Sequence, residues 1–498
     1  MLSLLGLSNF GDPFLPHCKI IVKDEVNVKL DGLDLVTRRK LTNKFKYEIP
    51  GARFMPAVKL GRWDGSVSFF TQGGLTFVNL LDDIVPILEE SNYTFDLEDK
   101  RETWNLSFDP VDKNTFADVT WPTGHTHEGQ SIILRDHQVE VINNFINNPQ
   151  CLQEVATAAG KTIITAALSK LIEPYGRSII IVPNKSLVTQ TEEDYKNMGL
   201  DVGVYFGDRK EPGHTHTICT WQSLNILEKK RQNAEDNLIE VFKRDVVCVI
   251  VDEVHMAKAD VLRRLLTNVY GYVPIRWGLT GTIPKADYEY KSIHVALGEV
   301  INRVSAVELQ EKGLLAKCNI EILQLWDYVD YKNYREEQTH LVTKKTRINY
   351  IARMIEQMRT SGNTLVLVDR VKSGEMLSET IINSVFVRGA TKADERKEHY
   401  DDIKTSNDKV IVATYGVAAV GINLPRIFNL VLVEPGKSFV RVIQSIGRGI
   451  RKAQDKDFVQ VWDVCSTAKF SKRHLTERKK FYREAQYPFS VTKVDYQK

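Results

Sequence analysis

The chain has 498 residues, of which 43% are hydrophobic and 26% are charged. This composition is ordinary for a globular protein with substantial cores, and it excludes a mainly disordered chain. Lysine and arginine number 67 against 64 aspartates and glutamates, so the net charge of +3 excludes a polybasic protein of the histone kind. Any nucleic-acid site must therefore arise from local patches of charge.

Six cysteines are spread along the chain without a CxxC pair. Their spacing fits neither a zinc module nor a disulfide scaffold, so we expect a reducing compartment, most simply the cytoplasm. No apolar run approaches the roughly 18 residues of a membrane span. The short apolar N-terminus lacks the basic start of a signal peptide. We expect neither export nor a membrane segment.

The length predicts about three domains, at roughly 100–200 residues each. Residues 1–128 have the pattern of a small α+β module that ends in a stretch rich in proline and glycine. Within it, alternating apolar positions predict an extended segment over Cys18–Lys29, and Asp82–Glu90 is predicted to be a short helix.

From about residue 130, short β-branched runs alternate with stretches of helical pattern. Such near-continuous apolar runs favour a parallel sheet buried on both faces. The length indicates two successive α/β domains, residues 129–318 and 319–498, joined near residues 316–325. The runs are Ser178–Val182, Val246–Val251, Thr364–Val368, Lys409–Ala413, Asn429–Val433 and Phe458–Trp462.

A phosphate-binding loop is indicated where one of these helices should begin. Backbone N–H groups at a helix N-terminus bind phosphate, and Gly160 lets the backbone come close. Lys161 would reach the β- and γ-phosphates, and Thr162 would bind Mg²⁺. Val155 replaces the usual first glycine of the motif, so an ordinary helix turn is the alternative. The predicted ATP-binding residues of this loop are Thr157, Ala158, Ala159, Gly160, Lys161 and Thr162.

Two adjacent carboxylates, Asp252 and Glu253, follow the apolar run Val246–Val251. A strand that ends in such a pair fits one acid that holds Mg²⁺ and one that polarises water. We assign Asp252 to the metal, and Glu253 to orienting and deprotonating the attacking water. The alternative is a solvated acidic pair that closes a strand, which is common for an isolated pair.

A third motif begins at Gln444 and contains Arg448 and Arg451. The two arginines are three residues apart and share a face if the segment is helical. Two guanidinium groups on one face can clamp the charge that develops on a γ-phosphate. By itself, such a basic turn is normally a solvated surface.

Together these motifs resemble the motor core of the superfamily 2 helicases of the DExH-box class, over residues 130–465. The resemblance implies two tandem RecA-like lobes with ATP and Mg²⁺ as cofactors, in a site that is complete only when the lobes close. Lys161, Asp252, Glu253, Gln444, Arg448 and Arg451 are implied to be catalytic. Further ATP contacts are implied for Arg135, Gln138, Gly421 and Asn423.

The same resemblance implies contacts with a nucleic-acid strand and residues that couple this contact to hydrolysis. In the coupling motif this chain has TGT where many relatives have SAT. The coupling residues are His255, Thr280, Gly281 and Thr282. The strand contacts are Pro183, Asn184, Lys185, Thr220, Trp221 and Gln222 in the first lobe, and Arg388, Gly389 and Thr414 in the second.

The segments Lys46–Pro56 and Gly61–Gly65 are similar to the N-terminal domain of phage recombination helicases of the UvsW type. Cations and aromatic rings are mixed there, which suits phosphate contacts plus base or sugar stacking. The alternative places the aromatic rings in a core and leaves the cations solvated. The predicted DNA-binding residues are Arg53, Lys59, Arg62 and Trp63.

The C-terminal residues from Lys472 to Arg483 also mix cations and rings. A helix there could cover the second lobe and touch DNA, or it could present a solvated face. The proline at Pro488 predicts the end of this helix.

The resemblance implies an ATP-dependent DNA helicase that unwinds or branch-migrates recombination, replication and repair intermediates. Its partner would be branched, forked or single-stranded/duplex junction DNA, bound without sequence preference and with strong salt dependence. We expect a monomer, in the host cytoplasm if a phage encodes it. Two alternatives are an RNA helicase or remodeller with the same motor, and a nucleic-acid-binding scaffold with an inactive ATPase.

Overall fold

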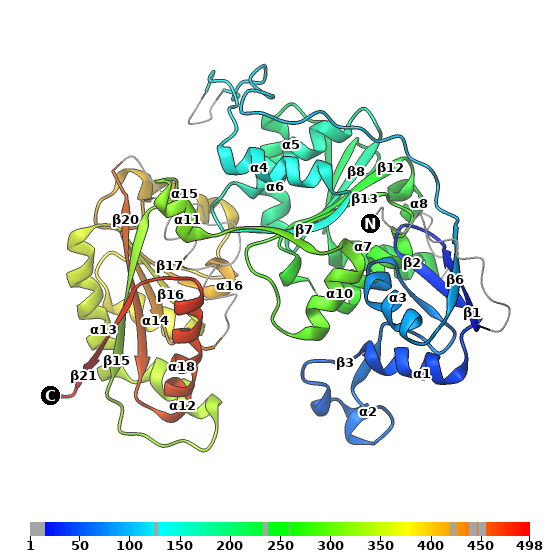
Figure 1. Ribbon diagram of the computed structural model, residues 1–498. Coiled ribbons are helices and arrows are strands. Elements are labelled where there is room, and N and C mark those ends of the chain that lie inside the picture. Colours follow the sequence, from blue (N-terminus) through cyan, green and yellow to red (C-terminus); the bar gives the residue numbers. More distant parts are fainter. Residues whose placement is uncertain are drawn as a thin grey trace. The chain divides into compact units, whose positions relative to one another are not determined.

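The computed structural model describes residues 15–123, 128–232, 238–257, 259–418, 424, 426–437, 446 and 455–498 (Figure 1). The chain divides into two compact units. One contains Met1–Glu154 and Lys161–Arg303, and the other contains Val155–Gly160 and Val304–Lys498. Among the described residues, no helix combines the length and apolarity that crossing a membrane requires.

The N-terminal part of the first unit is built on a four-stranded sheet in the order β5–β2–β1–β6. β1 is antiparallel to β2 and parallel to β6. The predicted short helix is confirmed as α3, whereas the predicted extended segment Cys18–Lys29 is divided by a turn into the two antiparallel strands β1 and β2. The elements are β1 (His17–Val22), β2 (Asn27–Asp31), α1 (Leu35–Lys44), β3 (Lys46–Glu48), α2 (Pro56–Lys59), β4 (Ser66–Ser68), β5 (Leu75–Phe77), α3 (Leu81–Glu90) and β6 (Thr94–Asp99).

This small sheet packs directly on the rest of the first unit. Its core includes Tyr288 and Val295 of helix α10 (Asp287–Leu297). A hydrogen bond also joins the turn between β1 and β2 to the following α/β region, because the Asn27 side chain donates to the carbonyl of Thr267 at 2.8 Å. The N-terminal α+β region therefore shares a core with the helices of the following α/β region.

The larger sheet of the first unit has eight strands in the order β10–β9–β11–β8–β12–β13–β7–β14. All six residues of β12 (Val246–Val251) are buried, as expected of a central parallel strand. Its other elements are α4 (Asp136–Asn147), β7 (Gln150–Val155), α5 (Lys161–Ile172), β8 (Arg177–Val182), α6 (Lys185–Asn197), β9 (Val202–Phe206), β10 (Arg209–Lys210), β11 (His216–Thr220), α7 (Trp221–Gln232), α8 (Leu238–Lys243), α9 (Ala259–Arg264), β13 (Ile275–Thr280) and β14 (Val300–Val304).

The second unit has a seven-stranded sheet in the order β17–β18–β16–β19–β20–β15–β21, with parallel pairings throughout. Its elements are α11 (Ala306–Glu311), β15 (Lys317–Leu325), α12 (Tyr334–Thr343), α13 (Lys345–Met358), β16 (Thr364–Val368), α14 (Val371–Thr380), β17 (Val385–Val387), α15 (Ala393–Thr405), β18 (Val410–Thr414), α16 (Tyr415–Ala418), β19 (Asn429–Val433), β20 (Phe458–Ser466), α18 (Lys469–Glu484) and β21 (Phe489–Val494).

Two features of this unit differ from the pattern in the sequence. The expected joint near residues 316–325 falls on β15, which is a full strand of the second sheet. Helix α18 ends at Glu484, before Pro488. After Pro488 the chain forms a further strand, β21, which pairs with β15 at the sheet edge. The fold class is nevertheless as predicted: two parallel-sheet α/β regions preceded by a small α+β region.

Candidate nucleotide and nucleic-acid sites

The predicted phosphate loop is a turn that leads directly into α5, which begins at Lys161. The amide of Ala159 donates to the carbonyl of Ala156 at 3.2 Å, and both Ala158 and Gly160 have left-handed backbones, with φ of 70° and 85°. A left-handed conformation is natural for glycine but costs a residue with a Cβ roughly 1–2 kcal/mol. Backbone strain at Ala158 is therefore retained immediately before the helix, as is common at functional sites.

Lys161 and Glu253 form a buried ion pair. Their Nζ and Oε1 atoms are 3.1 Å apart, with side-chain exposures of 8% and 11%. The pair joins the start of α5 to the end of β12, which lie far apart in the sequence. A buried ammonium and a buried carboxylate each need an opposite charge nearby, so each group compensates the desolvation of the other.

The two adjacent carboxylates have different surroundings. Burial raises the pKa of Asp252, and the neighbouring charge of Glu253 raises it further, while Lys161 opposes both. Burial alone would raise the pKa of Glu253 too, but Lys161, His255 and the N–H of Gly281 hold the pKa of that carboxyl below its ordinary value. Two carboxylates with separated proton affinities suit two different roles.

The structure brings the predicted coupling residues together at the ends of β12 and β13, which are parallel neighbours. The amide of Gly281 donates to Oε2 of Glu253 at 3.2 Å. Nδ1 of His255 hydrogen-bonds Oγ1 of Thr280, whose hydroxyl also contacts the carbonyl of Thr282 at 2.7 Å. A change at Glu253 can therefore pass to the segment after β13 through a continuous set of contacts.

Glu253 itself has a left-handed backbone, with φ of 49°. Its amide donates to Oδ1 of Asp252 at 2.8 Å, and the amide of Asp252 continues the sheet by donating to the carbonyl of Ile181. Burial lowers the pKa of the neighbouring His255, so this imidazole is neutral near pH 7. A neutral imidazole can accept as well as donate, which suits a hydrogen-bond relay.

The predicted nucleic-acid contacts of the first lobe also lie close together, because the neighbouring β-strands β8 and β11 are parallel and Thr220 pairs with Val182. Asn184 caps α6 by accepting from the amide of Leu187 at 3.1 Å, and the Gln222 side chain donates to the carbonyl of Pro183 at 3.2 Å. Lys185 is exposed beside them. The predicted contacts Pro183, Asn184, Lys185, Thr220 and Gln222 thus lie at neighbouring strand ends.

Two residues in this group behave differently from the rest. Trp221 is only partly exposed and packs against the core of the first unit. Ser223 is the last residue of the motif that begins at Thr220, although no contact was predicted for it, and it shares a 2.9 Å hydrogen bond with the hydroxyl of Thr220. The three-residue spacing of these two hydroxyls at the start of α7 is the signal that could have found Ser223.

The remaining ATP-contact candidates begin with Arg135 and Gln138 at the start of α4. The Gln138 side chain accepts from the amide of Arg135 at 2.9 Å, which fixes the first turn of the helix. Gln138 is buried, whereas Arg135 is exposed. Five candidates lie outside the described residues: Gly421, Asn423, Gln444, Arg448 and Arg451.

In the second unit, the guanidinium of Arg388 pairs with Glu375 at 2.7 Å, and Gly389 has open space where a side chain would be. Thr414 is half-buried at the end of β18. Arg388 would have to exchange its carboxylate partner for a phosphate in order to bind DNA. The exchange is feasible because the pair is well exposed to solvent.

The N-terminal cations lie around the two-stranded ribbon of β3 and β4. Arg53 stacks over the ring of Phe54, which is 65% exposed, and Lys59 and Arg62 are exposed. Trp63 is half-buried and donates its indole N–H to the carbonyl of Ser66 at 2.9 Å. The predicted cations are thus available to a ligand, as is Phe54, for which no contact was predicted, and Trp63 serves mainly to fix the turn.

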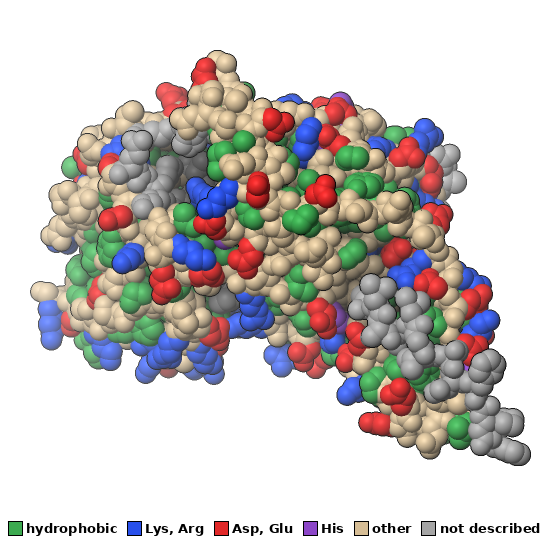
Figure 2. Space-filling view, turned by 45° about the horizontal axis from the view of Figure 1, so that its top comes forward, with side chains coloured by type: hydrophobic (Ala, Val, Ile, Leu, Met, Phe, Trp, Pro, Cys, Tyr) green, Lys and Arg blue, Asp and Glu red, His purple; other side chains and the backbone are tan. Residues whose placement is uncertain are grey.

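Charge on the visible face of the molecule is mixed. Figure 2 shows acidic and basic side chains interspersed over it rather than gathered into one large field. This pattern agrees with the small net charge of the whole chain. Any nucleic-acid site on this face must therefore consist of a small group of residues.

Comparisons with known proteins agree on one family. Residues 131–285 match the family model described as the res subunit of type III restriction enzymes, and residues 346–453 match the helicase conserved C-terminal domain. The ATP-dependent DNA helicase uvsW of Enterobacteria phage T4 is 23% identical over 93% of both chains. The DNA 3'-5' helicase XPB of Kineococcus radiotolerans is 22% identical, over 73% of this chain and 65% of its own length.

Among solved structures, the ATP-dependent type ISP restriction–modification enzyme LlaBIII bound to DNA has the same fold, with a TM-score of 0.55 at 14% identity. The alignment covers 83% of this chain and 36% of that one. The phosphate loop, the carboxylate pair and the coupling residues all fall within residues 131–285, the segment that the first family model matches. The chain belongs to superfamily 2 of the helicases.

Proposed function

We propose that this chain is an ATP-dependent DNA helicase that unwinds or branch-migrates recombination, replication and repair intermediates. The observation that carries the proposal is the buried pair of Lys161 and Glu253, linked through Gly281 and His255 to the segment after β13. In this proposal Lys161 is the phosphate-binding cation and Glu253 the water-polarising carboxylate, and their contacts with Gly281 and His255 form the relay. The T4 relative that aligns over 93% of both chains supports DNA as the polynucleotide.

In this proposal ATP binds with its phosphates on the loop 157–162. Lys161 then turns from Glu253 to the phosphates, because the triphosphate offers the larger negative charge. Glu253 loses the cation that depresses its pKa and becomes a stronger base for the attacking water. ATP binding thereby switches on the base that hydrolyses it.

Mg²⁺ fits the donors that the site provides. Thr162 offers a hydroxyl and Asp252 a carboxylate, both hard oxygen ligands of the kind Mg²⁺ prefers. When it is bound, the ion neutralises charge on the β- and γ-phosphates. Arg135 and Gln138 complete the ATP contacts of the first lobe in this proposal.

The second lobe completes the site with residues assigned from the sequence alone. Arg448 and Arg451 act on the γ-phosphate, with Gln444, Gly421 and Asn423 as further contacts. The division into an N-terminal region and two lobes belongs to the same proposal, with the boundary between the lobes placed before β15 and not within it.

The protein binds the phosphate backbone of DNA. The contacts are the predicted residues at the ends of β-strands in both lobes, together with Arg53, Lys59 and Arg62 of the N-terminal ribbon. Such binding is independent of base sequence and weakens steeply with salt. Branched, forked and junction DNA are the substrates, and the protein acts as a monomer in the cytoplasm of the cell in which it is made.

The proposal is tested by measuring ATP hydrolysis with branched DNA, single-stranded DNA and structured RNA at two salt concentrations. We expect the greatest stimulation by branched DNA, reduced at the higher salt. Lys161→Ala should abolish turnover. Equal stimulation by RNA would favour an RNA remodeller, and turnover that Lys161→Ala leaves unchanged would overturn the proposed site.

A further inference from the structure

A second group of cations and aromatic rings lies in the second unit, partly on the C-terminal helix for which the sequence left a DNA contact open. A hollow of about 830 Å³ opens beside the residues that follow β16 and β19 and the first half of α18. Its lining includes Tyr334, Lys437, Phe470, Arg473 and His474. This volume is within the range of sites that bind small organic groups.

Three rings of this lining form one cluster. The centroid of Tyr334 lies 4.7 Å from that of His474 and 6.3 Å from that of Phe470, in edge-to-face arrangements. Tyr334 is 36% exposed in this cluster. An exposed aromatic face supported at its edges by other rings is a platform on which a flat ring can stack.

The lining of the hollow carries two cations, Lys437 and Arg473, and two acids, Asp369 and Glu477. Lys437 and Arg473 have no acidic partner within the described part of the chain, whereas the lining acid Glu477 already pairs with Lys480 at 3.0 Å. Asp369, the other lining acid, accepts from Gln338 at 2.8 Å. Helix α18 carries seven lysines and arginines against two glutamates, so the platform lies on a strongly basic helix.

His474 contributes no charge of its own near neutral pH. Burial lowers its pKa to about 4, and the nearby positive charges of Arg478, Lys437 and Arg473 act in the same direction. The imidazole therefore remains neutral and can donate to or accept from a polar group of a ligand. Lys437 and Arg473 are left as the groups able to bind an anion.

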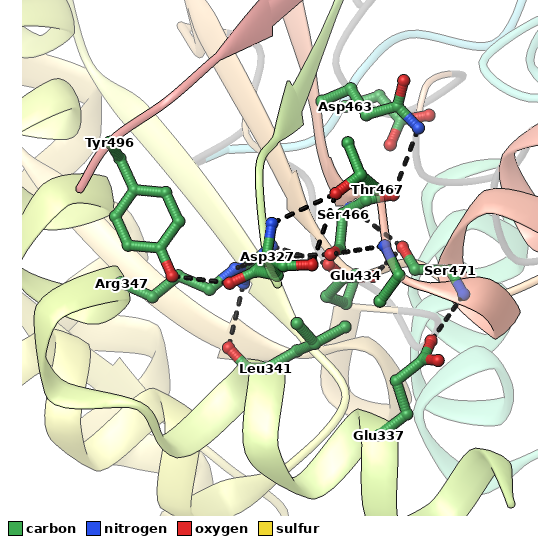
Figure 3. Close-up of polar contacts among 12 residues, drawn as sticks. Asp327, Glu337, Leu341, Arg347, Glu434, Asp463, Ser466, Thr467, Ser471 and Tyr496 are labelled. Carbon is green, nitrogen blue, oxygen red and sulfur yellow. Dashed lines mark hydrogen bonds and ion pairs between the residues drawn. The ribbon is translucent and has the colours of Figure 1, made fainter. Parts of the chain in front are cut away.

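The walls of the hollow are held in place by a buried polar network. Glu337, on the same helix as Tyr334, accepts from the amides of Phe470 and Ser471 at the start of α18. Figure 3 shows the Glu337 carboxylate directed at Ser471, whose hydroxyl in turn donates to Glu434 at 2.8 Å. Because the first amides of α18 are already satisfied by Glu337, an anion here would meet side chains and not the helix terminus.

The opposite wall is fixed by Arg478. Its buried guanidinium pairs with Asp463 at 2.7 Å and donates to the carbonyl of Gly436, also at 2.7 Å, next to Lys437. Arg347 joins Asp327 and Glu434 deeper in the same network. A site whose walls are fixed before binding loses little conformational entropy when a ligand enters.

We propose that this hollow binds a nucleotide of single-stranded DNA, with the base stacked on Tyr334 and the flanking phosphates held by Lys437 and Arg473. The inference rests on the proposed function and deepens it by adding a contact for an unpaired base. A paired base inside a duplex cannot stack on a side chain, so the site selects single strands. It would engage the strand that unwinding releases.

The test compares binding of fluorescein-labelled oligo(dT) and of a blunt duplex to the full-length chain by fluorescence anisotropy. Tyr334→Ala should weaken oligo(dT) binding about 5- to 100-fold, and Tyr334→Phe should preserve it. Arg473→Ala should weaken it and lower the slope of log affinity against log salt by about 0.7. Lys472→Ala is the matched control, because Lys472 is exposed on the same helix but does not line the hollow.

Duplex binding and ATP hydrolysis without DNA should stay unchanged in these variants. The inference is overturned if Tyr334→Ala binds oligo(dT) as well as Tyr334→Phe, or if Arg473→Ala matches Lys472→Ala. Wild-type protein that binds no DNA at all would overturn the proposed function as well, which separates the two failures. Photo-crosslinking with 5-iodo-deoxyuridine in the oligonucleotide should label Tyr334 or the segment 470–474, and labelling confined to other peptides would contradict the site.

Discussion

Lys161 Nζ lies 3.1 Å from Glu253 Oε1, and this contact joins the first residue of α5 to the residue after the metal-binding candidate Asp252. The cation that should bind phosphate and the carboxylate that should activate water thus neutralise each other. Breaking such a pair without replacing a partner leaves a buried charge, which is costly. In the proposed mechanism a triphosphate replaces Glu253 as the partner of Lys161, so nucleotide binding and the release of the Glu253 carboxylate are one event.

Replacing Glu253 with Gln should leave ATP binding intact and reduce turnover at least about 100-fold. The amide keeps the shape of the side chain but cannot accept the proton of the attacking water. Binding is measured with a fluorescent ATP analogue and turnover by phosphate release. Glu289→Gln, an exposed carboxylate on α10, is the control and should behave as wild type. Loss of binding in Glu253→Gln would mean that the roles of the two acids are reversed.

Lys161→Met should lower the free energy of unfolding by about 3–5 kcal/mol, because Glu253 is then buried without its cation. Lys170→Ala, on the same helix, removes a partly exposed pair with Glu173 and should cost less than about 1 kcal/mol. Chemical unfolding followed by circular dichroism checks both values. The double variant Lys161→Met/Glu253→Gln should recover most of the loss, and a simple sum of the two single effects would show that the pair is not coupled.

Ala158→Gly should raise the stability of the chain by about 1 kcal/mol, because glycine adopts the left-handed backbone at this position without a steric penalty. Ala159→Gly should act in the opposite direction, since Ala159 is buried and has no positive φ. The midpoint of thermal unfolding reports both changes. Equal shifts in the two variants would show that the backbone of residue 158 is unstrained in solution.

Thr280→Val should separate hydrolysis from strand separation. The methyl group replaces the hydroxyl that contacts both His255 and the carbonyl of Thr282, without changing the volume much. We expect unwinding of a forked duplex to fall at least about tenfold, a typical coupling energy, with ATP turnover largely retained. Thr280→Ser keeps the hydroxyl and should restore unwinding. Unwinding that follows turnover in every variant would remove Thr280 from the relay.

Glu192 makes part of the chain's stability dependent on pH. Hydrogen bonds from Arg209, at 2.7 and 2.9 Å, and from Lys196 hold its pKa near 2, below the ordinary 4.5. A depressed carboxyl pKa stabilises the fold above the ordinary value, and this contribution disappears as the pH falls from about 4.5 toward 2.

The measurement compares wild type with Glu192→Gln. The difference in unfolding free energy should be about 2 kcal/mol near pH 7 and should shrink as the pH approaches 3. Glu193→Gln, an exposed neighbour on α6, should show no such trend. A difference that is constant from pH 7 to pH 3 would mean that the ion pair does not hold the Glu192 charge in the folded state.

Much of the fold and of the candidate site follows from local patterns. The run Val246–Val251 is recognisable as a buried parallel strand because six successive apolar, mostly β-branched residues leave no polar face. The same pattern does not identify β7 (Gln150–Val155) as a buried strand. Its sequence contains two glutamines and a glutamate, although it lies inside the sheet. Its place is decided by its neighbours β13 and β14, not by its own composition.

The sequence by itself determined the features that lie in contiguous motifs. These are the loop 157–162, the acid pair, and the order of motifs that identifies the family. Such motifs are contiguous, so their chemistry is visible before folding. Contacts between distant segments were decided only by tertiary structure, because pairing depends on which strands become neighbours. The Lys161–Glu253 pair, the packing of the N-terminal sheet on α10, and the hollow around Tyr334 and Arg473 all arise in this way.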